Sequence, residues 1–285
     1  MIAVPLAEAR DEAIFGGKAV ALGTAIRSGL LVPPGVALAT DLVDAIAHGD
    51  PAARDRLERA SAGLGGPFAV RSSAVGEDST AASFAGQHAT VLNAVGIAAV
   101  SEAVGLIWRS ARSESAVAYR ERVGADTTVR VGVVVQRLIA ADVAGVLFTS
   151  NPVTGARELV VEASWGLGEA VVQGLVIPDR YRIARGGEVL ARTPGWKTVA
   201  VRPRDGDTYE EAVEGALVEQ LCIGDPELQG IHELAAGCDR VFGPGPHDIE
   251  WAIESNVLYL LQRRPVTTGR PAATGIDGPT RITRE

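Results

Sequence analysis

The stretch that decides the fold reads DIEWAIESNVLYLLQRRP and occupies positions 248–265. Apolar and polar residues alternate on both sides of a short polar turn, which predicts a β-hairpin. Side chains two positions apart on a strand point to the same face, so Asp248 and Glu250 share one face. The isoleucines and the tryptophan that alternate with these acids form the other, apolar face.

The polar face of this hairpin carries groups that suit a metal ion. Gln262 and Arg264 share a face on the return strand. Two carboxylates and an amide oxygen are the hard ligands that Mg²⁺ takes, and Arg264 adds positive charge against a polyphosphate. The same pattern also fits an exposed, charged strand face without a ligand.

The register of the hairpin bears on the metal interpretation. Asp248, Glu250 and Gln262 can serve one site only if they lie on the same face of the sheet. Pairing Glu250 with Gln262 requires an odd-length loop or a β-bulge. A regular two-residue turn at Ser255-Asn256 would instead place Gln262 on the far face. We therefore expect an odd-length loop or a bulge.

Outward from the hairpin, the chain divides into two parts of different character. Residues 1–125 indicate a helix-rich lobe, 126–268 a strand-rich lobe, and 269–285 a loose tail. The predicted fold class is α+β, with two lobes and a cleft between them. The expected helices are 16–29, one capped by Asp41, 51–64, 98–124, 209–222 and 225–242. The expected strands besides the hairpin are 68–70, 90–92, 128–138, 145–149, 159–162 and 181–184.

Three features of the first lobe suit an anion. Lys18 follows two glycines at a helix start, where backbone N–H groups attract negative charge, although a solvated lysine fits the same position. Arg71 follows the buried strand 68–70, so its side chain is expected to emerge at a strand end. The loop 83–90 has a glycine between hydroxyl side chains, which suits phosphate oxygens but also fits a surface turn.

Composition excludes some classes of partner. The 285 residues carry a formal net charge of −8, which disfavours a nucleic-acid surface. Of the 27 basic residues, 25 are Arg, and only Lys18 and Lys197 are Lys. Coding bias explains the excess of Arg, but the two remaining lysines draw attention, and Lys197 could face the same cleft as Lys18.

The chain also lacks several familiar signals. No secretory signal begins it, and the most apolar stretch, 129–148, is interrupted by charges, so a cytoplasmic protein without a membrane span is expected. Cys222 and Cys238 are expected to be free thiols. Neither a GxxxxGK[ST] loop nor a GxGxxG fingerprint occurs, so nucleotide binding needs other support.

Seven stretches carry a family likeness that covers about residues 10 to 268. They are GGKAVALG (16–23), VPPGVAL (32–38), AVRSSAVGEDSTAASFAGQ (69–87), TVLN (90–93), AGVLFTSNPVTG (144–155), EASWGLGEAVVQGLVIPDRY (162–181) and DIEWAIESNVLYLLQRRPVT (248–267). In this order they resemble the N-terminal ATP-binding domain of phosphoenolpyruvate synthase, pyruvate phosphate dikinase and the rifampin phosphotransferases. The resemblance implies an ATP-grasp fold, in which two lobes clasp ATP.

The resemblance also implies roles for individual residues. Lys18, Arg71 and Arg264 match the phosphate-binding and catalytic cations, and the segment from Gly86 to Thr90 matches the glycine loop over the phosphates. The remaining matches are a metal site for Mg²⁺ at Asp248, Glu250 and Gln262, an adenine hinge at Gln136, Arg137 and Leu138, and a site residue at Glu169 in the GLGE segment.

One position departs from the family pattern. The family helix that reads W-x-S-x-x-x-x-R-A-x-x-Y-R is matched from Trp108 to Arg120, but its internal arginine, a phosphate ligand, falls on Ser115. Arg112 lies three residues earlier on the same helix face and is the candidate substitute.

The function that the resemblance implies is ATP- and Mg²⁺-dependent phosphoryl transfer. Family members phosphorylate a histidine on a further domain, but none of the four histidines here has a matching context. The acceptor would then be a histidine on a separate partner protein or a small molecule. Two alternatives stay open: a ligase that forms an acyl phosphate, and a nucleotide-binding module without turnover, which Ser115 favours.

Overall fold

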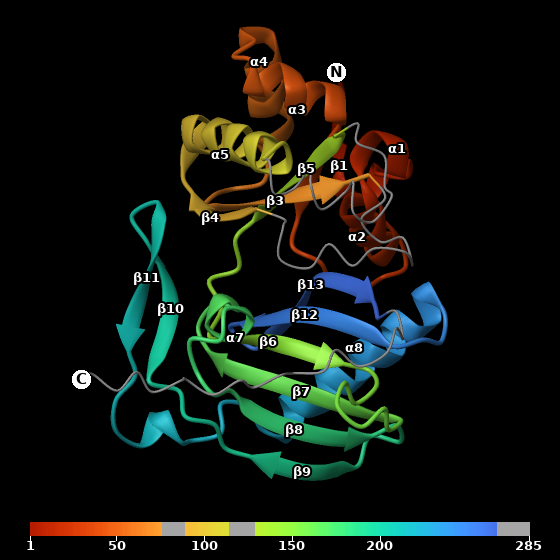
Figure 1. The fold of residues 1–285 in the computed structure, drawn as a ribbon, viewed down its shortest axis with the longest axis vertical. Coiled ribbons are helices and arrows are strands. Elements are labelled where there is room, and N and C mark those ends of the chain that lie inside the picture. Colours follow the sequence, from red (N-terminus) through yellow and green to blue (C-terminus); the bar gives the residue numbers. More distant parts are fainter. Residues whose placement is uncertain (76–88, 114–128, 267–285) are drawn as a thin grey trace, which may run out of the picture.

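The computed structural model describes residues 1–75, 89–113 and 129–266, and it has the predicted α+β fold (Figure 1). A five-stranded antiparallel sheet forms the centre of the first lobe, with strand order β1-β2-β5-β3-β4. Its strands are β1 (Ala3–Pro5), β2 (Gly35–Leu38), β3 (Phe68–Ala74), β4 (Thr90–Ala94) and β5 (Val131–Arg137).

Helices enclose the first sheet. The helices α3 (Thr40–Ala47), α4 (Pro51–Ser61) and α5 (Gly96–Ala111) pack their apolar residues against it in one core. The short η1 (Leu6–Glu8) and α1 (Glu12–Phe15) precede α2 (Gly17–Arg27). Buried residues of α2, among them Leu22, belong to a second core that continues into the other lobe. The helix that carries Lys18 therefore contacts both lobes.

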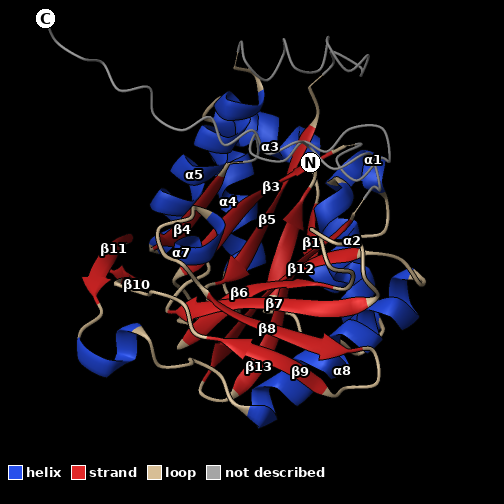
Figure 2. Ribbon diagram, turned by 60° about the horizontal axis from the view of Figure 1, so that its bottom comes forward, coloured by secondary structure: helices blue, strands red, loops and turns tan. Residues whose placement is uncertain are grey.

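A six-stranded antiparallel sheet forms the second lobe, in the order β13-β12-β6-β7-β8-β9. Helix α8 (Asp225–Phe242) has the predicted bounds and covers one face of this sheet (Figure 2). Ile249, Leu147, Val161 and Tyr181 pair in one row and are fully buried on that face. The strands are β6 (Val143–Phe148), β7 (Glu158–Trp165), β8 (Asp179–Ala184), β9 (Val189–Thr193), β12 (His247–Glu254) and β13 (Val257–Pro265).

Of the two expected alternatives, an odd-length loop or a bulge, the hairpin β12–β13 has the bulge. Ser255 and Asn256, both with positive φ, form a two-residue turn, and regular pairing continues to Trp251 opposite Leu260. The register then shifts, so that Glu250 pairs with Gln262. The bulge therefore corrects the parity that the two-residue turn would otherwise impose, and the predicted polar residues share one face.

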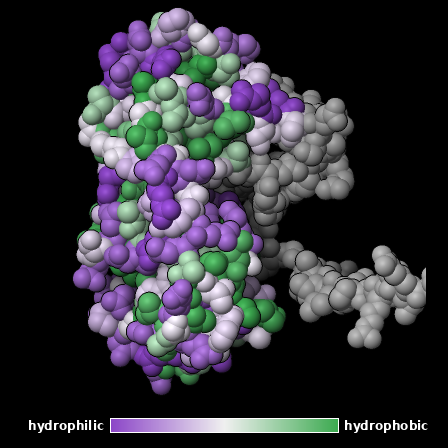
Figure 3. All heavy atoms as spheres, turned by 90° about the vertical axis from the view of Figure 1, so that its left-hand side faces the viewer, coloured by the Kyte–Doolittle hydropathy of each residue, from purple (hydrophilic) through white to green (hydrophobic). Residues whose placement is uncertain are grey.

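A two-stranded sheet and two short helices complete the second part of the chain. They are β10 (Val199–Arg204), β11 (Asp207–Ala212), α7 (Glu169–Val172) and η2 (Gly215–Val218). Asn93 Nδ2 on β4 donates to the carbonyl of Asp207 at 2.5 Å, which links this hairpin to the first sheet. Hydrophilic side chains gather across the middle of the face that Figure 3 shows, where the lobes meet.

The helix predicted over 209–222 is wrong. Tyr209 belongs to β11 and pairs with Arg202 on β10, and the Arg204 guanidinium lies 3.4 Å from the centre of the Tyr209 ring. Only η2 is helical in the rest of that range. Cross-strand pairing and stacking on the aromatic ring decided the structure of this segment against its helical pattern.

Three predicted boundaries also change. Strand β3 continues to Ala74, so Arg71 lies within a strand rather than at its end. Asp41 lies in the first turn of α3, whose N-cap is Ala39. Strand β5 pairs with β2 and β3, although a boundary between 125 and 126 would assign it to the second lobe. We therefore propose the lobe boundary after Arg137, where sheet membership changes.

Some expectations lie outside the described residues. The predicted helix 98–124 is described only as far as residue 113, and the tail 269–285 is not described. Cys222 and Cys238 are free thiols, as expected. Within the described ranges, no helix is both long and apolar enough to cross a membrane.

Candidate active site

A cavity of about 440 Å³ lies between the two larger sheets. That volume is in the range of small-molecule sites. Ten of the thirteen predicted site residues line it, from both lobes: Lys18, Arg71, Thr90, Gln136, Arg137, Leu138, Glu169, Glu250, Gln262 and Arg264. Residues more than 200 positions apart therefore meet in one cleft, as the two-lobed interpretation predicted.

Lys18 is positioned by a close contact between α2 and β3. Gly16 has a φ of +79° and precedes the helix, and the Ala19 N–H donates to Ser73 Oγ at 3.0 Å. A Cβ on Gly16 would lie 1.9 Å from the Ser73 carbonyl oxygen. The helix start can approach the strand only with glycine at position 16, and this approach places Lys18, 5% exposed, at the cavity wall.

We expect Gly16→Ala to destabilise the protein by about 2 kcal/mol, or roughly 5 °C in Tm, because the helix start must move off β3. Gly29→Ala is the matched control, because Gly29 also has positive φ but a Cβ there would meet no atom within 4 Å. Calorimetry and ATP titration check this. Equal losses of stability and of ATP affinity in both variants would show that the contact with Ser73 does not position Lys18.

Positive charge in the cavity is only partly compensated. Arg71 Nη1 lies 3.4 Å from Glu250 Oε2, while Arg71 Nε is buried without a hydrogen-bond partner. In the described part of the chain, the Arg264 guanidinium forms no hydrogen bond or ion pair. Both arginines therefore keep donors available for an anionic ligand.

The two acids of the hairpin stand in different environments. Burial, and then the nearby Glu250, raise the pKa of Asp248 to about 6, and Arg264 partly offsets this. Asp248 Oδ1 is buried without a hydrogen-bond partner. Asp248 does not line the cavity; it pairs with Arg264, next along the strands to the Glu250–Gln262 pair on the same face.

This arrangement fits a hard divalent cation. An orphaned carboxylate oxygen, a second carboxylate and a buried amide lie on neighbouring pairs of one sheet face. Among the described residues, no group of three or more His, Cys, Asp and Glu side chains could hold a metal ion, so a site here depends on the Gln262 amide as well. Carboxylate and amide oxygens are ligands that Mg²⁺ accepts.

We expect Asp248→Asn to raise the stability of the metal-free protein. The pKa of this carboxyl is above its usual value, so its contribution to stability is lost as pH rises from about 4 through about 6. Removing the charge should then gain about 1–2 kcal/mol at pH 7.5, after allowance for partial exposure. Thermal melts with EDTA check this gain, and melts with Mg²⁺ should show no metal-dependent shift. A Tm of Asp248→Asn below that of the wild-type chain in EDTA would show that the Asp248 charge does not destabilise the metal-free protein.

Glu169 lines the cavity as a second acid besides Glu250. It is the first residue of α7, and burial is the main cause that raises its pKa, with Glu250 adding to it and Arg71 opposing it. Its carboxyl therefore senses both partners of the ion pair described above. Glu169, the site residue expected in the GLGE segment, therefore lies in the cavity wall.

The hinge region contributes an apolar wall. Gln136 is buried, and its Nε2 donates to the Pro33 carbonyl at 3.0 Å. The N–H groups of Arg137 and Leu138 donate to backbone carbonyls at 2.9 and 2.8 Å. These donors are thus engaged within the protein, and recognition of a base by them stays a prediction. The apolar lining here comprises Leu138, Ile139, Ala141, Leu167, Ala252 and Leu261.

Arg112 does not reach the cavity. Its Nη2 contacts Asp44 Oδ1 at 2.9 Å and the Val129 carbonyl at 3.0 Å, and the guanidinium lies 4.1 Å from the Trp108 ring centre. In this structure Arg112 is held outside the cavity, and its replacement of the arginine missing at Ser115 stays a prediction. Arg112 is the C-cap residue of α5, and there Asp44, Trp108 and the Val129 carbonyl contact its guanidinium.

Lys197 does not face the cleft either. It is fully buried, and its Nζ lies 2.5 Å from Asp179 Oδ1, which also accepts from the Gly195 N–H. The charge of this lysine is therefore paired with Asp179 inside the protein.

Two further residues of the sequence analysis, Gly86 and Ser115, lie outside the described residues.

Sequence reasoning missed some cavity residues. Gly145 on β6 lines the cavity, and a Cβ there would lie 1.9 Å from the Glu162 carbonyl oxygen. Val172 and Gln173, one turn beyond Glu169, also line it. All three lie in stretches that carried the family likeness, but only the packing between strands and α7 brings them to the cleft.

Two lobes with helices and sheets enclose the cavity, and the fold is of the ATP-grasp class. The chain belongs to the family described as pyruvate phosphate dikinase, AMP/ATP-binding domain, which matches residues 52–277.

The similar proteins are mostly much longer. A rifampicin phosphotransferase of Streptomyces sp is 40% identical over 86% of this chain and 28% of its own length. A probable phosphoenolpyruvate synthase of Methanothermobacter thermautotrophicus is 41% identical over 70% of this chain and 29% of its own length. The L-amino acid ligase structure from Bacillus licheniformis aligns with a TM-score of 0.42 and 13% identity, over 90% of this chain and 44% of that one. The chain thus spans under a third of these two curated relatives.

Proposed function

We propose that this chain is the ATP- and Mg²⁺-dependent module of a phosphotransferase. The observation that carries the proposal is the bulge in β12–β13, which pairs Glu250 with Gln262 beside Arg71 and Arg264 in one cavity. A regular hairpin would have placed the amide and the second arginine on the core face. The membership in an AMP/ATP-binding family supports the nucleotide.

Each side chain has a role in this proposal. Lys18, Arg71 and Arg264 bind and orient the phosphates, and Glu250, Gln262 and Asp248 hold the metal. Mg²⁺, when bound, neutralises charge on the phosphate oxygens. The apolar wall at Leu138 takes the base and excludes water from that end of the cleft. Glu169, close to Arg71, keeps that guanidinium oriented in the cavity.

The acceptor is proposed to be a histidine on a separate protein or domain, with a small molecule as the second possibility. The support is that the relatives named phosphotransferase and synthase extend well beyond the part that this chain matches.

A nucleotide-binding module without turnover is the second candidate. It is favoured by Ser115 at the family's arginine position, and by the contact with Asp44 that holds Arg112 outside the cavity. The loss of a charge-assisted contact to a phosphate costs about 1.5–3 kcal/mol.

Positional isotope exchange in ATP separates the candidates. The purified chain is measured alone and then with proteins or small molecules offered as acceptors, and direct binding of ATP is measured alongside. Exchange supports the phosphotransferase. Bound ATP without exchange under any condition would leave the binding module, and exchange that depends on an amine or carboxylate would indicate a ligase.

A further inference from the structure

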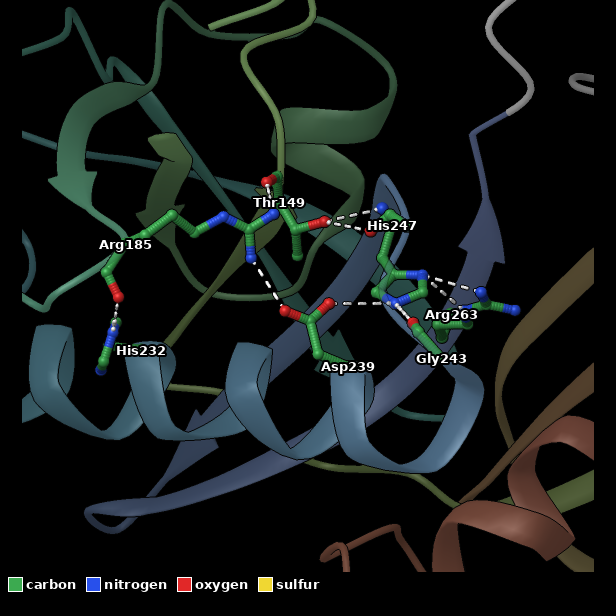
Figure 4. Close-up of polar contacts among 8 residues, drawn as sticks. Thr149, Arg185, His232, Asp239, Gly243, His247 and Arg263 are labelled. Carbon is green, nitrogen blue, oxygen red and sulfur yellow. Dashed lines mark hydrogen bonds and ion pairs between the residues drawn. The ribbon is translucent and has the colours of Figure 1, made fainter. Parts of the chain in front are cut away.

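On the core-facing side of the β12–β13 hairpin lies a polar cluster around the buried His247, which the proposed function does not use (Figure 4). His247, the first residue of β12, is 1% exposed. Arg263 Nε and Nη2 lie 3.1 and 2.7 Å from His247 Nδ1. An arginine only donates, so Nδ1 is the acceptor and the ring proton is on Nε2. That N–H donates to the Gly243 carbonyl at 3.1 Å, with Asp239 Oδ1 at 3.3 Å.

The register connects this cluster to the cavity. Side chains alternate along each strand, so His247 and Arg263 face the core, and their neighbours Asp248 and Arg264 face the cavity side. Asp248 and Arg264 are a direct cross-strand pair. Any rotation of the backbone at His247 or Arg263 therefore moves a metal ligand or a phosphate-binding cation.

Further contacts immobilise both residues. The Arg263 guanidinium lies 4.6 Å from the ring centre of Phe242. The His247 N–H donates to Thr149 Oγ1 at 2.7 Å, and the Thr149 N–H donates to the His247 carbonyl at 2.9 Å. Side-chain contacts hold Arg263 on β13, and backbone hydrogen bonds hold the start of β12 against the end of β6.

An ion pair closes the cluster on its outer side. Arg185 Nη1 lies 2.9 Å from Asp239 Oδ2, and its Nη2 donates to the Thr149 carbonyl. The ring of His247 therefore lies where the ends of α8, β6, β8 and β12 meet, as the side chains in Figure 4 show. A buried network of this kind, with both ring nitrogens satisfied, specifies one geometry.

We propose that His247, through Arg263, is a positioning residue for Asp248 and Arg264, and that it sets their orientation for a metal-bound nucleotide. The inference rests on the proposed function, because it assigns the metal and the phosphates to these side chains. Ligands of a metal or a phosphate must be held within a fraction of an ångström, and residues behind them usually supply this constraint.

The test compares the ATP affinity of the full chain with Mg²⁺ and with EDTA; the ratio is the metal-dependent gain. His247→Leu removes both ring hydrogen bonds, and we expect the gain to fall about tenfold, with a smaller loss of affinity in EDTA because Arg264 also binds the phosphates. His247→Asn keeps an acceptor near the position of Nδ1 and should restore most of the gain. Arg263→Lys, which cannot make the two-donor contact, should lose part of it.

Cys238→Ala is the control for stability. Cys238 is fully buried on α8 in the core beside the same sheet, so this change should lower Tm without lowering the gain. A wild-type gain retained in His247→Leu, or lost equally in Cys238→Ala, would overturn the positioning role. If His247→Leu does not fold, retention of the full gain in Arg263→Lys would overturn it. A wild-type chain that shows no gain would overturn the proposed function itself.

Discussion

Glu250→Gln is expected to lower phosphoryl transfer by about 10³-fold and to remove the effect of Mg²⁺ on ATP affinity. Glu250 is the acid of the hairpin that lines the cavity; it pairs with Gln262 beside the bulge and contacts Arg71. The substitution keeps the shape of the side chain but removes the charge that we propose holds the metal. Isotope exchange and ATP titration with and without Mg²⁺ measure the two effects.

Glu162→Gln is the matched control for this variant. Glu162 pairs with Val146, which in turn pairs with Glu250, so both acids lie in one row on the same face of the sheet. Glu162 does not line the cavity. We expect wild-type turnover and an unchanged Mg²⁺ effect in this control. Equal losses in both variants would mean that the effect arises from the charge of the sheet face and not from a metal ligand.

Arg71→Met is expected to weaken ATP binding by about 100-fold. A charge-assisted hydrogen bond to a phosphate contributes about 1.5–3 kcal/mol, and a guanidinium can make two. The variant also leaves Glu250 without its cation, 3.4 Å away in the wild-type chain. Arg71→Lys keeps the charge but loses the planar fork, so we expect an intermediate loss of about tenfold. Calorimetric titration with ATP measures both.

The control for Arg71 is Arg192→Met. Arg192 pairs with Asp225 in an exposed position, 39% and 80% accessible for the two side chains. Such surface pairs contribute about 0–1 kcal/mol, so neither Tm nor ATP affinity should change appreciably. An Arg71→Met protein that binds ATP as tightly as Arg192→Met would remove Arg71 from the proposed phosphate site.

Local patterns predicted much of the fold correctly. Helix α8 was predicted with the bounds that the structure has, because an Asp-Pro start and a long apolar periodicity are signals within one element. Parity and a shared polar face required an odd-length loop or a bulge, and the two-residue turn in the structure leaves the bulge. The helix predicted over 209–222 is wrong, because pairing with β10 outweighed the pattern.

In the site, too, side chains with similar local sequence have different tertiary partners. Lys18 and Lys197 look alike as sparse lysines next to glycine-containing segments, and only one faces the cavity. Arg71 and Arg112 both lie in segments that the family likeness marked, yet Arg112 is held by Asp44 and Trp108. The partners of Lys197 and Arg71 lie 18 and 179 positions away in the chain, beyond the reach of any local pattern.

The sequence by itself determined the polar face of the hairpin, the glycine-rich start before Lys18, the α+β class and the likeness to an ATP-binding family. These depend on alternation, on backbone freedom and on residue types that recur in order. Tertiary structure alone decided which charges meet and which are neutralised. A charged side chain takes the partner that burial and strand pairing bring to it, so Arg71 meets Glu250 in the cleft while Lys197 meets Asp179 in the core.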